Sequence, residues 1–282
     1  MKVGIGLPNP IPGTPGRLLI EWARRAEELG FTSLATIDRL AYPSYESMTV
    51  LAAAAAATER LELIPNVLVA PSRNPVLLAK EAATVDQVSG GRLTLGIGVG
   101  NRPDDFEVSD TNFHDRGRRV ERMIETMQAA WRGDPVAGSP KPVTPRPVRD
   151  EIPLLIGGGT ERSVQRAARF GVGWTAGGLP PDAVKKMAEQ VKTAFKGRQP
   201  RIVALVYYGL GDSNLEASLG YLRDYYAFTG DFAETIAQNA LRSAEAIKGA
   251  LSAYEEAGVT DLILDPTVAD IRQVDMLAEI VL

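Results

Sequence analysis

Residues 61–100 read LELIPNVLVAPSRNPVLLAKEAATVDQVSGGRLTLGIGVG, and this stretch decides the fold. Its two ends, Leu61–Val69 and Arg92–Val99, are short runs rich in Val, Ile and Leu, as expected of strands that are buried on both faces. Between them lies Val76–Val88, an alanine-rich segment that we expect to be helical. A strand, a helix and a second strand in this order are typical of a unit in a parallel sheet.

The same alternation continues on both sides of this stretch. The predicted strands are Val3–Leu7, Ser33–Ile37, Leu61–Val69, Arg92–Val99, Pro153–Ile156, Gly173–Ala176, Arg201–Tyr208 and Asp261–Leu264. Between them, apolar residues recur at a spacing of about 3.6, which indicates helices that face a core. A doubly wound open sheet also fits this alternation. Eight such units in 282 residues favour a closed α/β fold, a (β/α)8 TIM barrel that spans residues 1–282 as a single domain.

Glycine follows several of the predicted helices, at Gly30, Gly171 and Gly258. Glycine at this position accepts the left-handed conformation that returns the chain to the sheet, so we expect that conformation at all three. The segment 214–258 is long enough to hold more than one helix, which predicts an extra element before the eighth strand.

The segment from about 133 to 153 contains six prolines and therefore cannot form a helix or a central strand. We interpret it as a semi-rigid connector into the fifth strand in preference to a lid over a substrate.

Composition excludes several kinds of protein. The net charge of −4 is spread without long blocks of one sign, so we expect no nucleic-acid or membrane partner. No apolar run approaches the roughly 20 residues that a membrane span needs. The first residues read directly into a predicted strand, so we expect no signal or transit peptide. Because cysteine is absent, disulfides and thiolate zinc sites are excluded, and we expect a cytoplasmic protein.

Histidine is nearly absent as well. The one histidine, His114, cannot build a histidine metal cluster, and we expect no bound metal. A Ser-His-Asp triad could form only through His114, which we interpret as an ordinary surface or capping residue.

The active site of a barrel lies at the C-terminal ends of its strands, so the residues that follow each strand are the candidates. Asp38-Arg39 follow the second strand, Gly100-Asn101-Arg102 the fourth, Gly157-Gly158-Gly159-Thr160 the fifth and Asp265-Pro266 the eighth. Glycine is concentrated here, as the close approach of a flat ligand requires.

The glycine turn from Gly157 to Thr160 is the strongest local signal. Its bare N–H groups, the Thr160 hydroxyl and the start of the next helix form a cradle that favours a phosphate. The alternative is a tight turn in which Thr160 is only an N-cap. We favour phosphate binding.

A second glycine set, Gly96, Gly98 and Gly100, occupies alternate positions of the fourth strand and leaves holes on one of its faces. The holes either admit a bulky neighbour from the barrel core or leave room for a planar ring. The sequence does not decide between these two interpretations.

The segment Arg73–Gly100 resembles the central signature of the luciferase-like family of flavin- and deazaflavin-dependent oxidoreductases. The resemblance extends to Trp22–Leu34, Arg116–Trp131 and Ile152–Trp174. It implies a barrel that binds FMN or coenzyme F420 at its strand ends.

The resemblance also implies roles for single positions. Gly157, Gly158, Gly159 and Thr160 would hold the cofactor phosphate. Asn66 and Val67, where family members often have a non-proline cis peptide, would press on the ring. Gly100 and Asn101 would lie near the ring edge and Asp38 near the reacting face.

Two positions depart from the family pattern. Many members have Asp-His where this chain has Asp38-Arg39, and many deazaflavin members have glutamate where Asn101 stands. Arginine is a poor acid–base catalyst but a good clamp for an anion. We therefore take Asp38, Arg39 and Asn101 as candidate catalytic residues, and expect Asp38 and Arg39 to face the pocket.

The resemblance predicts an oxidoreductase or monooxygenase that acts on a small organic molecule, with F420 slightly favoured over FMN. One alternative is a non-catalytic flavin-binding or carrier protein of the same fold. Another is a phosphosugar-handling barrel that is unrelated to flavins. The alanine-rich helices Ser47–Thr58 and Val76–Val88 further predict a homodimer, because small side chains allow close contact between helices.

Overall fold

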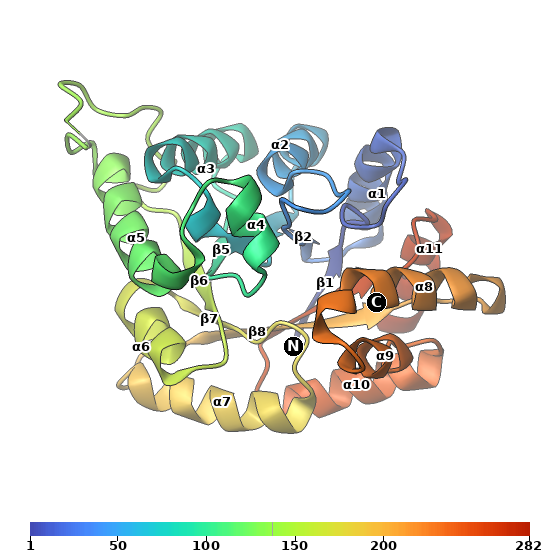
Figure 1. The fold of residues 1–282 in the computed structure, drawn as a ribbon. Helices are drawn as coiled ribbons and strands as arrows, with labels where there is room; N and C mark the ends of the chain where they lie inside the picture. The colour runs from blue at the N-terminus through green and yellow to red at the C-terminus, as the bar shows by residue number, and fades with distance from the viewer. Residues whose placement is uncertain (137) are drawn as a thin grey trace.

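Parallel strands form a closed barrel, and helices alternate with them around its outside (Figure 1). The computed structural model describes residues 1–136 and 138–282. The strands are β1 (Lys2–Gly6), β2 (Ser33–Thr36), β3 (Glu62–Pro65), β4 (Leu68–Val69), β5 (Leu95–Gly98), β6 (Leu154–Gly157), β7 (Gly173–Thr175), β8 (Arg201–Tyr208) and β9 (Asp261–Pro266). Their order in the sheet is β3-β2-β1-β9-β8-β7-β6-β5-β4. Because β3 and β4 are consecutive pieces of one predicted strand, this order closes the (β/α)8 barrel.

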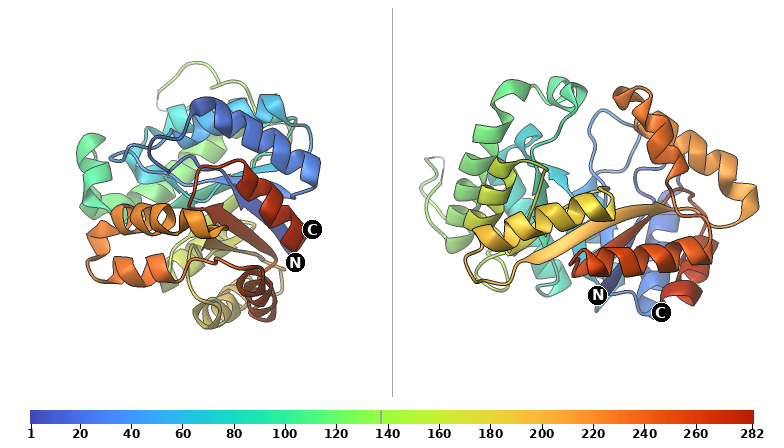
Figure 2. Two further views of the ribbon diagram at one scale, coloured as in Figure 1. Left: turned by 90° about the vertical axis from the view of Figure 1, so that its right-hand side faces the viewer. Right: turned by 90° about the horizontal axis from the view of Figure 1, so that it is seen from below.

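The helices form the outer ring and part of one end. They are α1 (Gly16–Leu29), α2 (Ser47–Ala57), α3 (Pro75–Ser89), α4 (Pro103–Val108), α5 (Arg116–Arg132), α6 (Glu161–Phe170), α7 (Pro181–Ala194), α8 (Leu215–Tyr225), α9 (Phe232–Gln238), α10 (Ala244–Glu256) and α11 (Arg272–Val281). Helices α4, α8 and α9 lie at one end of the barrel, and the two termini lie at the other (Figure 2). The segment 214–258 thus contains several helices, which confirms the predicted extra element.

The third barrel strand is broken, which corrects the prediction of one continuous strand over Leu61–Val69. It is divided into β3 and β4 at Asn66 and Val67, whose shared peptide bond is cis, as the resemblance implied. A parallel bridge between Leu63 and Leu93 joins the β3 side to the chain that leads into β5.

The barrel interior has a small apolar layer of its own. It consists of Ala35, Ile64, Leu155, Val203 and Ile263, all buried. A larger cluster fills the space between the strands and the outer helices and includes Trp22, Trp131 and Trp174. The prediction that the strands are buried on both faces is therefore confirmed.

The side chain of Val67 fills the holes that the glycines leave. A Cβ atom on Gly98 would lie 2.5 Å from Val67 Cγ2, and one on Gly157 would lie 3.2 Å from Val67 Cγ1. A Cβ atom on Gly96 would lie 2.1 Å from the Pro65 carbonyl oxygen. Of the two interpretations of these glycines, the structure thus selects the bulky neighbour from the barrel core.

Two of the three helix-ending glycines have the predicted conformation. Gly30 has a φ of +101° and Gly258 one of +84°. The prediction for Gly171 is wrong, because its φ is −107°. A Cβ atom there would lie 2.9 Å from the Leu154 carbonyl oxygen, so glycine allows the end of α6 to approach β6 closely.

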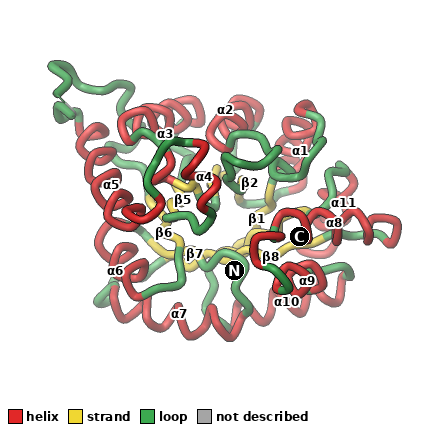
Figure 3. The backbone as a smooth tube through the Cα atoms, in the orientation of Figure 1, coloured by secondary structure: helices red, strands yellow, loops and turns green. Residues whose placement is uncertain are grey.

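The proline-rich connector runs along the outer ring. Residues 133–136 and 138–153 contain no helix or strand, and residue 137 of the predicted connector lies outside the described residues. Helix α3 holds the connector through Lys80 Nζ to the Thr144 carbonyl (2.7 Å) and Gln87 Nε2 to the Arg146 carbonyl (2.8 Å). Part of the connector projects beyond the ring of helices, away from α8 and α9 (Figure 3).

Within the described residues, no helix is both long and apolar enough to cross a membrane.

The packing of Val67 and Pro65 against β5 predicts the effect of small substitutions. Gly96→Ala places a methyl group against the Pro65 carbonyl, and overpacking of this kind lowers the free energy of unfolding by about 1–3 kcal/mol. Gly249→Ala in α10, where nothing lies within 4 Å of the added atom, should instead raise it by about 0.5–1 kcal/mol. Urea unfolding measures both, and equal stability of the two variants would contradict the packing described.

Candidate active site

The segments that carry the predicted site residues lie at the end of the barrel that carries α4 and α8 (Figure 1). All strands are parallel, so their C-terminal ends meet at this mouth. Arg102, which precedes α4, reaches across to the helical insertion after β8. Its guanidinium carbon lies 4.3 Å from the centre of the Tyr225 ring and 4.1 Å from that of Phe228. These cation–π contacts join the two elements that border the mouth.

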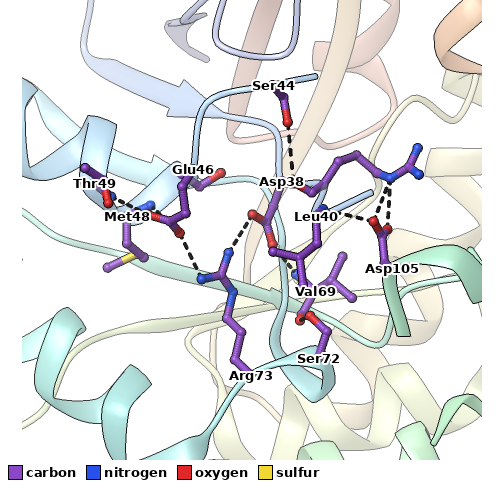
Figure 4. A network of polar contacts seen from close by, with 12 residues as sticks. Asp38, Leu40, Ser44, Glu46, Met48, Thr49, Val69, Ser72, Arg73 and Asp105 are labelled. Atoms are coloured by element: carbon purple, nitrogen blue, oxygen red, sulfur yellow. Dashed lines mark hydrogen bonds and ion pairs between the residues drawn. The ribbon is translucent and has the colours of Figure 1, made fainter. Parts of the chain in front are cut away.

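Asp38 anchors the strand that follows the break. Its Oδ2 accepts a hydrogen bond from the Val69 N–H (2.9 Å), and its Oδ1 pairs with Arg73 Nη2 at 2.7 Å (Figure 4). Burial raises the pKa of Asp38, while the Arg73 charge and the Val69 N–H act in the opposite direction. Because both oxygens are bound, the side chain fixes β4 relative to β2.

Arg73 extends this network to the start of α2. Its Nη1 lies 2.8 Å from Glu46 Oε1, and Glu46 caps α2 by accepting hydrogen bonds from the N–H groups of Met48 and Thr49 (Figure 4). Burial alone would raise the pKa of Glu46, but the Thr49 hydrogen bonds and the Arg73 charge bring it below its usual value. One cation thus holds two loops of the mouth together.

Arg39 binds α4. Its Nε lies 2.9 Å from Asp105 Oδ2, and its Nη2 lies 2.7 Å from Asp104 Oδ2. Asp105 Oδ1 also accepts hydrogen bonds from the N–H groups of Leu40 (2.9 Å) and Ala41 (2.8 Å). Asp38 and Arg39 both follow β2 and are buried, and that they face the pocket stays a prediction. The guanidinium of Arg39 is already held by two carboxylates, which does not support its interpretation as a clamp for an added anion.

Asn66 and Val67 present one polar and one apolar group at the mouth. Asn66 Oδ1 accepts a hydrogen bond from Thr175 Oγ1 (2.7 Å), while the buried Nδ2 has no partner in the described part of the chain. Val67 and Gly100 are half-buried, and Asn101 is exposed. Gly100 has a φ of +72°, and a Cβ atom on it would lie 2.6 Å from Val69 Cγ1.

The glycine turn caps α6, while phosphate binding at the turn stays a prediction. Thr160 is the N-cap of α6: its Oγ1 accepts from the Ser163 N–H (3.3 Å), and its own N–H donates to Ser163 Oγ (3.0 Å). Gly158 and Gly159 are exposed, and their N–H groups donate to no acceptor among the described residues. Gly157 is buried against Val67. The turn therefore keeps free donors for an anion, although Thr160 also serves as a cap.

A basic pocket of about 510 Å³ lies beside this turn. It is lined by Val99, His114, Asp115, Arg116, Gly117, Arg118, Thr160, Arg162 and Arg166. Arg166 is paired with Glu121 (2.9 Å), and Arg116 Nε donates to the Gly100 carbonyl (3.0 Å). Four guanidinium groups next to a helix N-terminus create a positive potential. Sequence reasoning missed these arginines as site residues, although Arg116-Gly117-Arg118 at a helix start is a visible signal.

The other half of the mouth is aromatic and contains a buried acid. Tyr207, Tyr221, Tyr225 and Tyr226 pack together there, and the Tyr207 and Tyr226 hydroxyls lie 2.8 Å apart. Asp265 lies at the end of β9, and neither of its carboxyl oxygens has a hydrogen-bond partner in the described part of the chain. Sequence reasoning noted Asp265 only as a strand-end residue.

Within the described residues, no group of three or more His, Cys, Asp or Glu side chains could hold a metal ion.

The Asp38 network predicts a large loss of stability on truncation. Asp38→Ala leaves the buried Arg73 without one of its two carboxylates, and removing one partner of a buried pair costs about 3–5 kcal/mol. The matched control is Asp134→Ala, which breaks the half-exposed pair with Arg132 and should cost less than about 1 kcal/mol. Chemical denaturation measures both changes. A loss at Asp38 as small as the loss at Asp134 would show that the network does not hold the mouth.

Nearly the whole chain resembles one protein family. The model of a family described as luciferase-like monooxygenase matches residues 1–274. An uncharacterized protein of Mycobacterium tuberculosis is 32% identical over 202 residues, which are 61% of this chain and 69% of the relative.

Two relatives carry names that state a reaction. The FMNH2-dependent dimethylsulfone monooxygenase of Pseudomonas putida is 28% identical over 61% of this chain and 51% of its own length. The F420-dependent glucose-6-phosphate dehydrogenase of Amycolatopsis mediterranei is 26% identical over 74% of this chain and 66% of its own length.

Among solved structures, the monooxygenase RslO1 from Streptomyces bottropensis has the same fold, with a TM-score of 0.83 and 24% identity over 100% of this chain and 98% of that one.

Proposed function

Because the chain belongs to the luciferase-like monooxygenase family, we propose that it is an oxidoreductase that binds coenzyme F420 or FMN reversibly and acts on a small organic molecule. The observation that carries this proposal is the pair of free N–H groups at Gly158 and Gly159 beside an arginine-lined pocket. Half-buried Val67 lies next to this turn, in contact with Gly157. A cofactor with a phosphate and a flat ring matches these two neighbouring features, the phosphate at the N–H groups and the ring against Val67.

The residues present fit both cofactors. The N–H groups of Gly158 and Gly159 and the Thr160 hydroxyl would bind the phosphate. Half-buried Val67 offers an apolar contact for the ring, and Asn66 Nδ2, which has no partner among the described residues, offers a hydrogen-bond donor to it. Gly100 and Asn101 would lie at the ring edge. The cofactor, when bound, would supply the hydride or oxygen chemistry, while the protein orients it and the substrate.

Coenzyme F420 is favoured slightly over FMN. Named relatives of the chain include one enzyme of each kind. F420 carries carboxylates beyond its phosphate, and the pocket that continues from Thr160 is lined by Arg116, Arg118 and Arg162. Arginine binds carboxylate and phosphate groups through paired N–H donors, so this pocket suits the more anionic cofactor.

The second candidate function is a flavin carrier without catalysis. It is favoured by Asn101, which replaces a glutamate common in the family, and by Arg39, whose charge is held by Asp104 and Asp105. In our proposal Asp38 and Arg39 act by positioning β4 and α4 instead of transferring protons. Turnover of any member of a substrate panel by the loaded protein would exclude the carrier function.

The phosphate proposal predicts a selective loss on Gly159→Val. No atom lies within 4 Å of a Cβ added at Gly159, so the valine obstructs an incoming anion without straining the fold. Losing one hydrogen bond to a charged group, worth about 1.5–3 kcal/mol, should weaken FMN or F420 binding about 10- to 100-fold. Riboflavin, which lacks the phosphate, should bind weakly to the parent and change far less. Equal affinity of the parent for riboflavin and FMN would refute the cradle.

We also propose that the chain forms a homodimer through α2 and α3. Leu77 and Val88 on α3 are 55% and 52% exposed, and the neighbouring helix α2 exposes Ala53 and Ala56. Apolar groups exposed in this way favour contact with a second copy. Sedimentation should show a dimer at micromolar concentration that Leu77→Arg converts to a monomer. Leu215→Arg, on the exposed face of α8, is the control and should leave the dimer intact. A monomeric parent protein would refute the interface.

A further inference from the structure

Asp265 points into the mouth of the barrel from β9. Side chains alternate along a strand, and Ile263, two residues earlier, belongs to the interior layer of the barrel. A Cβ atom on the neighbouring Gly6 would lie 1.7 Å from Asp265 Oδ1. The missing side chain of Gly6 therefore makes the room that the Asp265 carboxyl group occupies.

The carboxyl group is buried without a partner. Asp265 is 1% exposed, and neither oxygen makes a hydrogen bond within the described residues. The buried hydroxyl of Tyr221, in the same half of the mouth, also has no partner in the part of the chain that the structure describes. Buried polar groups are nearly always hydrogen-bonded in native proteins, so two such groups in one cluster point to a ligand that satisfies them.

The surroundings of Asp265 favour its neutral form. Burial raises its pKa well above the usual value for aspartate. The titratable groups near it are Tyr207 and Tyr208 of β8, Tyr221 of α8 and Tyr226 beyond α8, and none of them carries a positive charge. A neutral carboxylic acid is both a hydrogen-bond donor and an acceptor.

Asp265 and the proposed cofactor surface lie on different parts of the barrel wall. The glycine turn, Gly100 and Val67 come from β4, β5 and β6, whereas Asp265 and the tyrosines come from β8, β9 and α8. The apolar lining on the Asp265 side is made of tyrosine rings, with Tyr225 and Tyr226 5.1 Å apart. A compact, largely apolar molecule with one oxygen function fits a lining of this kind.

We propose that Asp265 is the specificity residue of the substrate subsite, a neutral acid that donates a hydrogen bond to the carbonyl oxygen of an apolar, ring-sized substrate. This inference rests on the proposed function for the identity of the cofactor but not for the subsite itself. It also provides the site with an acid, which neither Arg39 nor Asn101 can supply.

The test measures binding of acetophenone and of ethylbenzene, which has a similar shape without the carbonyl. The two probes are titrated into the protein, with and without FMN or F420, by calorimetry. The parent should prefer acetophenone over ethylbenzene by about 3- to 10-fold, the value of one neutral hydrogen bond. Asp265→Ala should lose this preference and still bind ethylbenzene as the parent does. Asp265→Asn, which keeps an N–H donor, should retain it.

The pH dependence distinguishes the acid from a structural residue. The preference of the parent for acetophenone should disappear as pH rises through the raised pKa of Asp265, while that of Asp265→Asn should not change. The free energy of unfolding should fall over the same pH range. A carboxyl group whose pKa is raised on folding stabilises the protein fully below its unfolded pKa of about 3.9, and this stabilisation is lost as pH rises through its folded pKa. Asp265→Asn should therefore gain stability relative to the parent as pH rises.

Three results would overturn the inference. One is equal affinity of the parent for the two probes, and another is absence of acetophenone binding at millimolar concentration. The third is an equal loss of affinity for both probes in Asp265→Ala while Asp265→Asn remains folded. That result would assign Asp265 a structural role. Failure of the proposed function gives a different pattern, because the parent would then bind neither cofactor yet still discriminate between the two probes.

Discussion

The mouth of this barrel depends on one packing constraint, the insertion of Val67 into the space left by glycines on two neighbouring strands. Gly98 and Gly157 have no side chains where the Val67 methyl groups lie, and Gly96 has none where the Pro65 carbonyl lies. Protein interiors are close-packed, so the side chain of Val67 fits only where these positions are glycine. The break in the third barrel strand is thereby fixed in place. It leaves Asn66 and Val67 at the mouth, between the glycine turn after β6 and the loop after β2.

Two ion-pair networks hold the loops around that break. Asp38, Arg73 and Glu46 join β2, β4 and the start of α2, and Arg39 joins the loop after β2 to Asp104 and Asp105 of α4. Asp38 and Arg39, two of the three candidate catalytic residues, thus hold loops of the mouth in place. What remains free to meet ligands lies elsewhere. Within the described residues, the groups without partners include the amides of Gly158 and Gly159, the guanidinium groups of Arg118 and Arg162 beside them, Asn66 Nδ2 and the carboxyl group of Asp265.

The fold could be predicted from the sequence because its signals are local. The alternation of apolar runs and helical segments placed the strands to within a few residues, and for Arg201–Tyr208 the bounds agree. The glycine turn was predictable for the same reason. The break at Asn66 and Val67 could not be found by periodicity, because apolar residues continue through it, and only the family resemblance indicated it. The left-handed prediction at Gly171 failed because a close approach to Leu154, which sequence does not reveal, decides that position. Arg116, Arg118 and Asp265 come from segments that are distant along the chain, so their place in the site depends on closure of the barrel.

Binding of a phosphate-bearing flavin or deazaflavin at the mouth is tested most directly by a fluorescence titration of the purified protein with coenzyme F420 and with FMN, at low ionic strength and again at high salt. We expect saturable binding of one molecule per chain for at least one of them, weakened by salt because arginines surround the phosphate site. Absence of saturable binding for both cofactors would contradict the proposal.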